Sequence, residues 1–171
     1  MVSGPRPHIG HPEAPPGAFK QSYMESVRLI EQLHRRYLEV VQAELKAQGV
    51  EDINNVQALM ILHIGMNELA VTDLLKRGYY LASNVSYNVR KLAEAGYLLQ
   101  ERSTADRRSI RLRLTDKGVE LHDRLTDMID RQVLALDNVT NFKDLQSATQ
   151  TFRHLGDFWH SLRRMGDLGG F

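Results

Sequence analysis

Apolar residues recur at helical spacing over long stretches at both ends of the chain. Between Phe19 and Gln48 they stand three, four or seven positions apart, which places them on one face of a helix. These positions are Tyr23, Val27, Ile30, Tyr37, Val41 and Leu45. The same spacing predicts a helix from Gly118 to about Leu136 and another over residues 142–165. Long helices are therefore predicted on both sides of the middle of the chain.

The middle of the chain carries shorter patterns that are separated by glycine. Glycine commonly follows the last residue of a helix, because it adopts positive φ without strain. Gly65, Gly78 and Gly96 are therefore predicted to mark the ends of elements. The predicted elements are, in order, a helix capped by Asn54 or Asn55, a short extended piece over 69–71, a short helix from Thr72 to Arg77 and a helix from about Ala82 to Ala95.

Two segments after Gly96 alternate apolar and polar residues, which is the pattern of half-buried β-strands. They span residues 97–103 and 109–115, and a polar turn over 104–108 joins them. The second segment alternates the apolar Ile110, Leu112 and Leu114 with Arg111 and Arg113. The two segments and their turn therefore predict a β-hairpin with arginines at its tip. The order of short strand, two helices and hairpin is that of a winged helix-turn-helix, so the predicted fold class is mainly α with a small β wing.

Composition excludes several classes of protein. The 171 residues include no cysteine, which rules out disulfide scaffolds, thiol catalysis and cysteine-ligated zinc. The seven histidines form no His-Glu-x-x-His motif and no glycine-rich phosphate loop occurs, so we expect no enzyme, no cofactor and no resident metal ion. The chain has no run of 18 apolar residues and no secretory signal pattern. We therefore expect a cytoplasmic protein without a membrane-spanning helix.

Charge is distributed unevenly, although the whole chain carries only +1. Nine basic residues between Lys76 and Arg113 are accompanied by three acidic ones, so this segment carries +6. The basic residues are Lys76, Arg77, Arg90, Lys91, Arg102, Arg107, Arg108, Arg111 and Arg113. A basic segment suits a polyanionic partner, although a solvated charged face gives the same count. The order of the elements favours double-stranded DNA as the partner.

Residues 97–118 resemble the wing of MarR-type transcriptional regulators. In that family an arginine ends the first wing strand, an Asp-x-Arg turn follows, and Leu-Thr-x-x-Gly leads into a long helix. The matching residues are Arg102, Asp106, Arg108, Leu114, Thr115 and Gly118. Upstream, Ser83-Asn84-Val85-Ser86 followed by Lys91-Leu92 and Gly96 is similar to the recognition helix of the family. The resemblance covers about residues 25–165 and implies a homodimeric, sequence-specific DNA-binding regulator.

Within the family, residues 78–88 look like the LdtR subgroup, which is linked to cell-wall L,D-transpeptidase genes and to stress tolerance. The segment reads Gly-Tyr-Tyr-Leu-Ala-Ser-Asn-Val-Ser-Tyr-Asn. The chain departs from the family pattern in two places. Gly78 precedes two tyrosines where an apolar residue and then glycine are usual, and Tyr87 stands where many members carry a basic residue. The operator sequence therefore cannot be carried over from other members.

The resemblance and the chemistry of the residues together predict the DNA contacts of the helix from about Ala82 to Ala95. An α-helix fits the major groove with its N-terminal residues against the base edges. The polar residues there are Ser83, Asn84, Ser86, Tyr87 and Asn88. Asn84 or Asn88 is suited to pair with adenine, whereas Ser83 serves equally well as a helix cap. Arg90 and Lys91, one turn further on, are predicted to neutralise phosphates.

The wing is predicted to reach DNA through Arg107 and Arg108, because arginine at a hairpin tip fits a narrow minor groove. Asp106 is predicted to order the turn by pairing with Arg102 or Arg108. Arg111 lies on the outer face of the second strand, where it is either a phosphate anchor or a solvated charge.

The helices at both ends of the chain are predicted to form a dimer layer, with packing inside one chain as the alternative. A two-fold dimer places two recognition helices about 34 Å apart on a pseudo-palindromic operator, which one winged module cannot read alone. The predicted organisation is a proline-rich tail over 1–18, a dimerisation helix over 19–52, the winged helix-turn-helix over 53–115, dimerisation helices over 116–165 and a frayed end over 166–171.

Members of the family commonly leave DNA when a small aromatic acid binds between the dimer layer and the DNA-reading module. The resemblance therefore implies a repressor or dual regulator with an effector pocket. The candidate lining residues are His34, Arg35, Tyr37, Met60, His63 and Tyr80. Tyr37 and Met60 fit a helical core equally well. Two alternatives stay open, namely a zinc-responsive regulator that uses His34, His63 and His122, and a winged module that binds protein without DNA.

Overall fold

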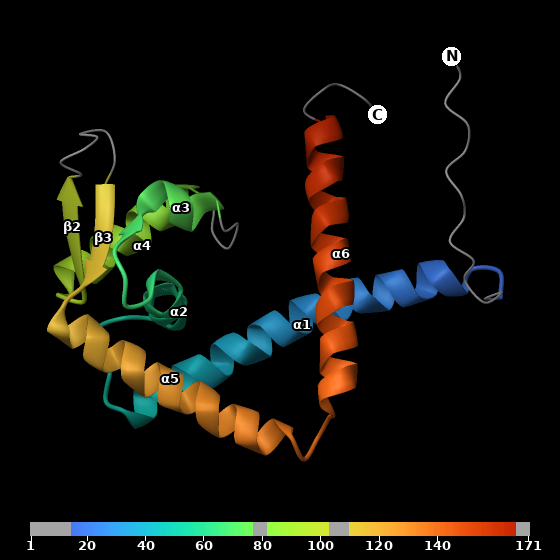
Figure 1. Cartoon of the computed structure of the whole chain (residues 1–171), viewed down its shortest axis with the longest axis horizontal. Coiled ribbons are helices and arrows are strands. Elements are labelled where there is room, and N and C mark those ends of the chain that lie inside the picture. Colours follow the sequence, from blue (N-terminus) through green and yellow to red (C-terminus); the bar gives the residue numbers. More distant parts are fainter. Residues whose placement is uncertain (1–14, 77–81, 103–109, 167–171) are drawn as a thin grey trace. The chain divides into compact units, whose positions relative to one another are not determined.

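The computed structural model describes residues 15–76, 82–102 and 110–166, whose course Figure 1 traces. They belong to two compact units, Met1–Val119 and Glu120–Phe171. The first unit holds α1 (Ala18–Ala47), α2 (Asn55–Ile64), β1 (Leu69–Ala70), α3 (Val71–Lys76), α4 (Ala82–Glu94), β2 (Leu98–Arg102) and β3 (Ile110–Leu114). Helix α5 (Asp116–Leu136) begins in this unit and continues into the second, which also holds α6 (Phe142–Gly166). A helical body with one small sheet confirms the predicted fold class.

Helix α2 forms the centre of the core of the first unit. Asn54 caps it, because Asn54 Oδ1 accepts a hydrogen bond from the Gln57 amide at 2.9 Å and Gln57 Oε1 accepts one from the Asn54 amide at 3.0 Å. This reciprocal pair satisfies two amides that the start of a helix leaves without partners. Asn55, the other predicted cap, donates from Nδ2 to the Leu38 carbonyl on α1 at 3.1 Å. The buried apolar side chains of α2 are Ala58, Leu59, Met60, Ile61 and Ile64.

Helix α1 is amphipathic, and only its C-terminal part carries buried side chains. Val41 and Leu45 are completely buried. The helix ends where Gly49, at φ 70°, turns the chain so that the Val50 amide donates back to the Leu45 carbonyl at 2.9 Å. The large apolar side chains that stay exposed include Phe19, Met24, Leu29, Leu33 and Val40.

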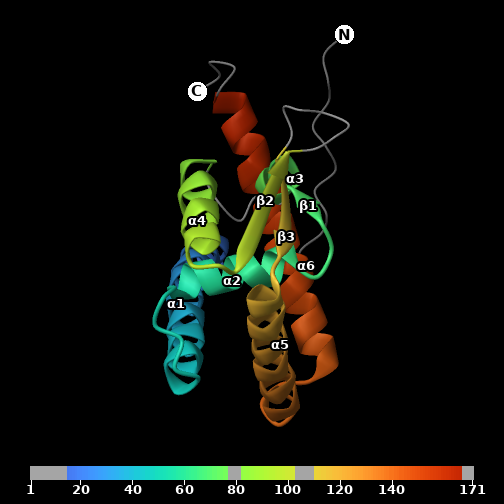
Figure 2. The ribbon, with the colours of Figure 1, turned by 90° about the vertical axis from the view of Figure 1, so that its left-hand side faces the viewer.

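The strands form an antiparallel sheet in the order β1-β3-β2, which Figure 2 shows with α4 beside it. In this register Leu69 pairs with Leu112, and Leu98 with Leu114. Leu112 and Leu114 are consequently buried, as predicted. Ile110, predicted to share their face, is the first residue of β3 and is 43% exposed.

Two helices begin earlier than predicted. Helix α3 begins at Val71, one residue before the expected cap Thr72. Helix α5 begins at Asp116, because the hydroxyl oxygen of Thr115 accepts a hydrogen bond from the Gly118 amide at 3.1 Å and so caps the helix. Gly118 lies inside the first turn, where any Cβ would overlap the backbone carbonyl of Tyr97. The glycine is therefore needed for close approach and not for a turn.

The second unit exposes a large amount of apolar surface. Helix α6 is capped by Asn141, whose side-chain oxygen accepts a hydrogen bond from the Asp144 amide at 3.0 Å. Leu125 and Met128 of α5 are buried, but no side chain described in α6, over residues 142–163, is buried. The most exposed apolar side chains of this unit are Val133, Leu134, Val139 and Phe142. Among the described residues, no helix combines the length and the apolar run needed to cross a bilayer.

Candidate nucleic-acid interface

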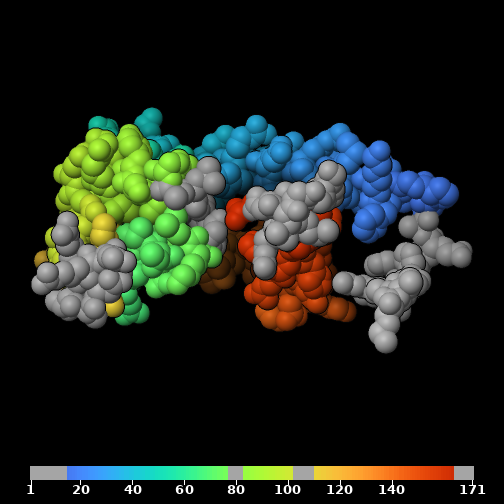
Figure 3. Space-filling view, turned by 90° about the horizontal axis from the view of Figure 1, so that it is seen from above, coloured from blue at the N-terminus to red at the C-terminus, as the bar shows by residue number. Residues whose placement is uncertain are grey.

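Helix α4 presents one buried and one open face. Val85, Val89 and Leu92 are buried, which confirms the predicted packing side of the helix. Figure 3 shows the outer surface of α4, in yellow-green, open on one side of the first unit. The exposed residues of the helix include Ser83, Asn84, Ser86, Tyr87 and Arg90. The N-terminal half of α4 therefore offers hydroxyl, amide and phenol groups to solvent.

Asn88 lies on the buried face of α4. Its side chain is only 7% exposed, and Nδ2 donates a hydrogen bond to the backbone carbonyl of Asn84 at 2.9 Å. A buried amide with a backbone partner stabilises the helix in place. This placement argues against the predicted base contact by Asn88 and leaves Asn84 as the asparagine that faces outward.

Side-chain contacts follow the exposed face of α4 toward its C-terminus. The Arg90 guanidinium lies 6.0 Å from the centre of the Tyr87 ring, and Arg90 Nε lies 3.6 Å from Glu94 Oε1. Lys91 Nζ donates a hydrogen bond to Glu94 Oε2 at 2.7 Å. The hydrogen bond from Lys91, together with the positive charges of Lys91 and Arg90, lowers the pKa of Glu94. Glu94 is therefore ionised and partners both cations.

Exposed cations are paired with carboxylates at the base of the wing as well. Arg111 on β3 pairs with Glu68, the residue before β1, at 2.8 Å. Arg113, two residues further along β3, lies 3.8 Å from Glu101 on the neighbouring strand β2. Both arginines are roughly half exposed, so they are accessible to a phosphate even while they are paired.

The basic segment is therefore less positive than its sequence indicates. Five of its nine cations have described side chains, and each lies within 3.8 Å of a carboxylate. These cations are Lys76, Arg90, Lys91, Arg111 and Arg113, and their partners are Glu68, Asp73, Glu94 and Glu101. The count of +6 missed Glu68 and Asp73, because both precede the segment in sequence. Glu94 stands at helical spacing from Arg90 and Lys91, which is a signal that the sequence did contain.

Several predicted site residues lie outside the described residues. They are Tyr80, Asp106, Arg107 and Arg108. Arg102 ends β2, where its backbone pairs with Ile110. The predicted roles of these residues in the wing stay predictions.

A polar cluster joins the base of the wing to the first turn of α5. Lys117 Nζ lies 2.6 Å from Asp52 Oδ2, 2.8 Å from the Ala95 carbonyl and 4.0 Å from the centre of the Tyr97 ring. The Tyr97 hydroxyl donates to Asp52 Oδ1 at 2.8 Å. Desolvation raises the pKa of Asp52, but hydrogen bonds from Lys117 and Tyr97 outweigh it and leave the pKa lowered. The hydrogen bond to Asp52 in turn raises the pKa of Lys117.

The candidate effector residues differ widely in burial. His34 and Arg35 are exposed on α1, whereas Met60 is completely enclosed in the core. Tyr37 is 37% exposed, and partial burial raises the pKa of its hydroxyl. The placement of Met60 therefore favours the core role that the sequence left open. Within the described ranges, no three histidine, aspartate or glutamate side chains gather as a metal site.

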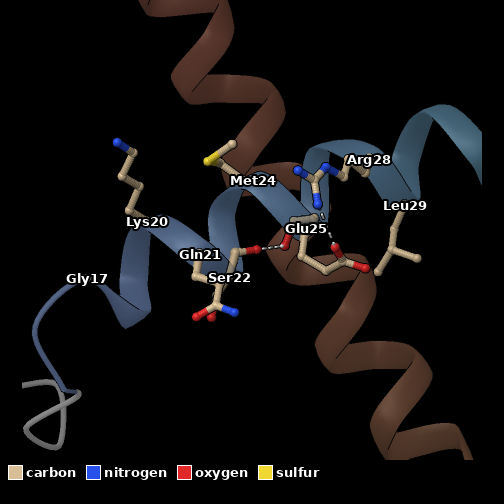
Figure 4. Close-up of a pocket in the computed structure, with 9 residues that line it drawn as sticks. Gly17, Lys20, Gln21, Ser22, Met24, Glu25, Arg28 and Leu29 are labelled. Carbon is tan, nitrogen blue, oxygen red and sulfur yellow. Dashed lines mark hydrogen bonds and ion pairs between the residues drawn. The ribbon is translucent and has the colours of Figure 1, made fainter.

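A hollow of about 750 Å³ runs along the first turns of α1, as Figure 4 shows. Lys20, Met24 and Leu29 are among its lining residues, and the Glu25–Arg28 ion pair spans 3.6 Å beside them. None of the candidate effector residues borders it.

Comparisons with known proteins agree with this geometry. A model of the winged helix DNA-binding domain matches residues 53–118. The exopolysaccharide II synthesis transcriptional activator ExpG of Rhizobium meliloti (strain 1021) is 38% identical over 146 residues, which cover 85% of this chain and 75% of ExpG.

Two solved structures have similar folds. The FabT protein of Streptococcus pneumoniae, in complex with DNA, has a TM-score of 0.66 and 20% identity, and the match covers 82% of this chain and 99% of FabT. A MarR transcriptional regulator from Methanosarcina mazei Go1 has a TM-score of 0.66 and 17% identity, over 81% of this chain and 99% of that protein.

Proposed function

The chain belongs to the MarR family of winged helix, DNA-binding transcriptional regulators, and from this premise we propose how it works. Two copies form a homodimer that binds a pseudo-palindromic operator. Each copy inserts α4 into the major groove and reaches the adjacent minor groove with the tip of its wing.

The observation that carries this proposal is the one-sided packing of α4. Its apolar residues are buried, while Ser83, Asn84 and Tyr87 are exposed along its N-terminal half. This is the half of a recognition helix that meets base edges. Asn84 is suited to the N6 and N7 atoms of adenine, and Arg90, nearly two turns later, is suited to a phosphate oxygen.

The exposed apolar surface supports the dimer. Soluble monomers rarely leave large contiguous apolar patches in water. Here the turn between α5 and α6 borders a hollow of about 300 Å³, with Leu134, Phe142 and Leu145 in its lining. The N-terminal two thirds of α1 add further exposed apolar side chains, including Leu29 and Leu33. We assign both surfaces to the dimer layer.

Selection of bound fragments from the source genome tests the proposal directly. We expect the retained fragments to share an inverted repeat whose half-sites lie about 10–11 base pairs apart from centre to centre, one turn of the duplex. Retention of fragments without any repeat would contradict two-fold reading, and failure to retain any fragment would contradict DNA reading by α4.

We further propose that the regulated genes act on polymers of the cell surface. ExpG is an activator of exopolysaccharide II synthesis, and residues 78–88 resemble the LdtR subgroup, which is linked to the cell wall. A relative that activates favours a dual regulator over a simple repressor. We expect a small aromatic ligand to release the protein from DNA by changing the spacing of the two recognition helices. A ligand that binds the selected complex without lowering DNA affinity would count against this mechanism.

A further inference from the structure

The two cations of α4 share a single carboxylate. Lys91 lies 2.7 Å and Arg90 3.6 Å from the oxygens of Glu94, and all three side chains are exposed by two fifths or more. Helix α4 contains no other charged residue. Glu94 therefore halves the net charge that the helix presents to DNA, from +2 to +1.

Helix stability does not explain the position of this carboxylate. Glu94 is the last residue of α4, where free carbonyl groups concentrate negative partial charge that disfavours an acid. In both ion pairs of Glu94 the cation is N-terminal to the acid, and this order stabilises a helix less than the reverse order. The pairs with Lys91 and Arg90 favour the charged form of Glu94, but they are exposed, so this carboxylate adds little to the stability of the helix.

Glu94 also restricts the direction of Arg90. The guanidinium lies between the Tyr87 ring, one turn toward the N-terminus, and the Glu94 carboxylate, one turn toward the C-terminus. Because Glu94 faces Nε, the two terminal nitrogens are left for a phosphate oxygen. The Arg90 side chain is 65% exposed, so these two contacts favour one direction of the guanidinium without fixing it, and they reduce the conformational freedom that is lost when it binds.

We propose that Glu94 is a specificity-determining residue, which withholds Arg90 and Lys91 from indiscriminate phosphate contacts and orients Arg90 for the operator. This inference rests on the proposed function, in which α4 reads DNA. Non-specific binding depends on phosphate contacts alone, whereas operator binding adds contacts to bases. A carboxylate among the cations therefore weakens non-specific binding more than operator binding, which also gains from the ordered Arg90.

Glu94→Gln tests the inference, because it keeps the size of the side chain and removes its charge. We expect the full-length variant to bind a random-sequence duplex about two- to fivefold more tightly, the range of one exposed ion pair. Affinity for the tightest fragment of the genomic selection should not rise, so the ratio of the two affinities should fall by about the same factor. Fluorescence anisotropy at two salt concentrations measures both, and thermal unfolding should show little loss of stability, because the ion pairs of Glu94 are exposed.

Glu25→Gln is the matched control, because Glu25 is an exposed carboxylate paired with Arg28 on α1 and its loss changes the total charge equally. Equal effects of the two variants on both duplexes would overturn the inference, since net charge alone would explain them. Arg90→Ala separates the two proposals. If Arg90→Ala weakens operator binding while Glu94→Gln matches the control, only the role of Glu94 is lost. If neither Arg90→Ala nor Glu94→Gln alters binding, the cations of α4 do not contact DNA and the inference about Glu94 fails. If Asn84→Ala also leaves operator binding unchanged, the proposed function fails with it.

Discussion

At the scale of single residues, the cluster around Asp52 shows how few side chains hold the base of the wing. Asp52 precedes α2, Tyr97 precedes β2, and Lys117 lies in the first turn of α5, so three segments distant in sequence meet at one carboxylate. Tyr97 is 3% exposed and contributes apolar contact as well as a hydroxyl. Asp52 and Lys117 are each nearly half exposed, so solvent screens their attraction.

Lys117→Met should lower the free energy of unfolding by about 0.5–1 kcal/mol at neutral pH, the upper part of the range for an exposed pair. The pKa of Asp52 is lowered in the folded state, so its contribution is present above its ordinary pKa, near 4, and disappears as the pH falls through the folded value. The raised pKa of Lys117 keeps the pair intact up to at least the ordinary lysine value, near 10.5. Urea denaturation at pH 7 and pH 2.5 measures the difference between wild type and variant.

Lys20→Met on the exposed part of α1 is the charge-matched control for this series. A difference between wild type and Lys117→Met that is equally large at pH 2.5 would show that the ammonium group stabilises the fold through the Tyr97 ring and the Ala95 carbonyl, and not through the ion pair with Asp52.

At the scale of elements, α4 buries one face in the core and exposes the other, with which we propose that it reads DNA. Asn84 and Asn88 are one turn apart and chemically identical, yet Asn88 is buried while Asn84 is exposed. The hydrogen bond from Asn88 to the Asn84 carbonyl ties the two positions together without involving the Asn84 side chain. Substitution of each asparagine in turn therefore compares an exposed with a buried position of the same helix.

Asn84→Ala should weaken operator binding by tenfold or more, because a good base contact contributes about 1–3 kcal/mol, and should leave thermal stability unchanged. Asn88→Ala should instead lower the free energy of unfolding by about 1–2 kcal/mol through the loss of a buried hydrogen bond and its packing. Anisotropy and thermal unfolding of both variants measure the two effects. The reverse result, with binding lost in a fully stable Asn88→Ala protein, would assign the base contact to the other asparagine.

Periodic elements could be predicted from the sequence, whereas contacts between distant segments could not. Alternation predicted the inward leucines of β3, and helical spacing predicted Val85, Val89 and Leu92 as core. Asn88 stands three residues after Val85 and four before Leu92, so the same spacing placed it on the buried face. It was predicted to be exposed because asparagine is polar. The Glu68–Arg111 pair depends on the β1–β3 register across 43 positions, which no local pattern reports.

At the scale of the whole molecule, the described part of the chain leaves several large apolar side chains exposed. Leu134 and Phe142 are 75% and 78% exposed on either side of the turn between α5 and α6, and both border the same hollow. In a monomer such residues contribute little to folding. In the proposed dimer each is buried twice, once in each copy.

Replacing Leu134 and Phe142 together by serine should therefore leave the fold of one chain intact and weaken the dimer. Burial of a large apolar side chain contributes roughly 1.5–3 kcal/mol, so losing four in the dimer should raise its dissociation constant by a factor of a thousand or more. Sedimentation analysis measures the shift to monomer, and operator affinity should fall with it. Met66→Ser, at a residue that is 53% exposed before β1, is the control. A double variant that stays dimeric would place the interface elsewhere.

Helix α5 has a mechanical consequence, because it runs unbroken for 21 residues and belongs to both compact units. Its first turn is fastened to the hairpin by the Thr115 hydroxyl, which donates to the Gly96 carbonyl at 2.7 Å, and by the contact of Gly118 with the backbone of Tyr97. Beyond Gly118 the helix contains no glycine or proline at which it would kink. A second chain that packs on the later turns of α5 would therefore bind the same unbroken helix whose first turn is fastened to the hairpin.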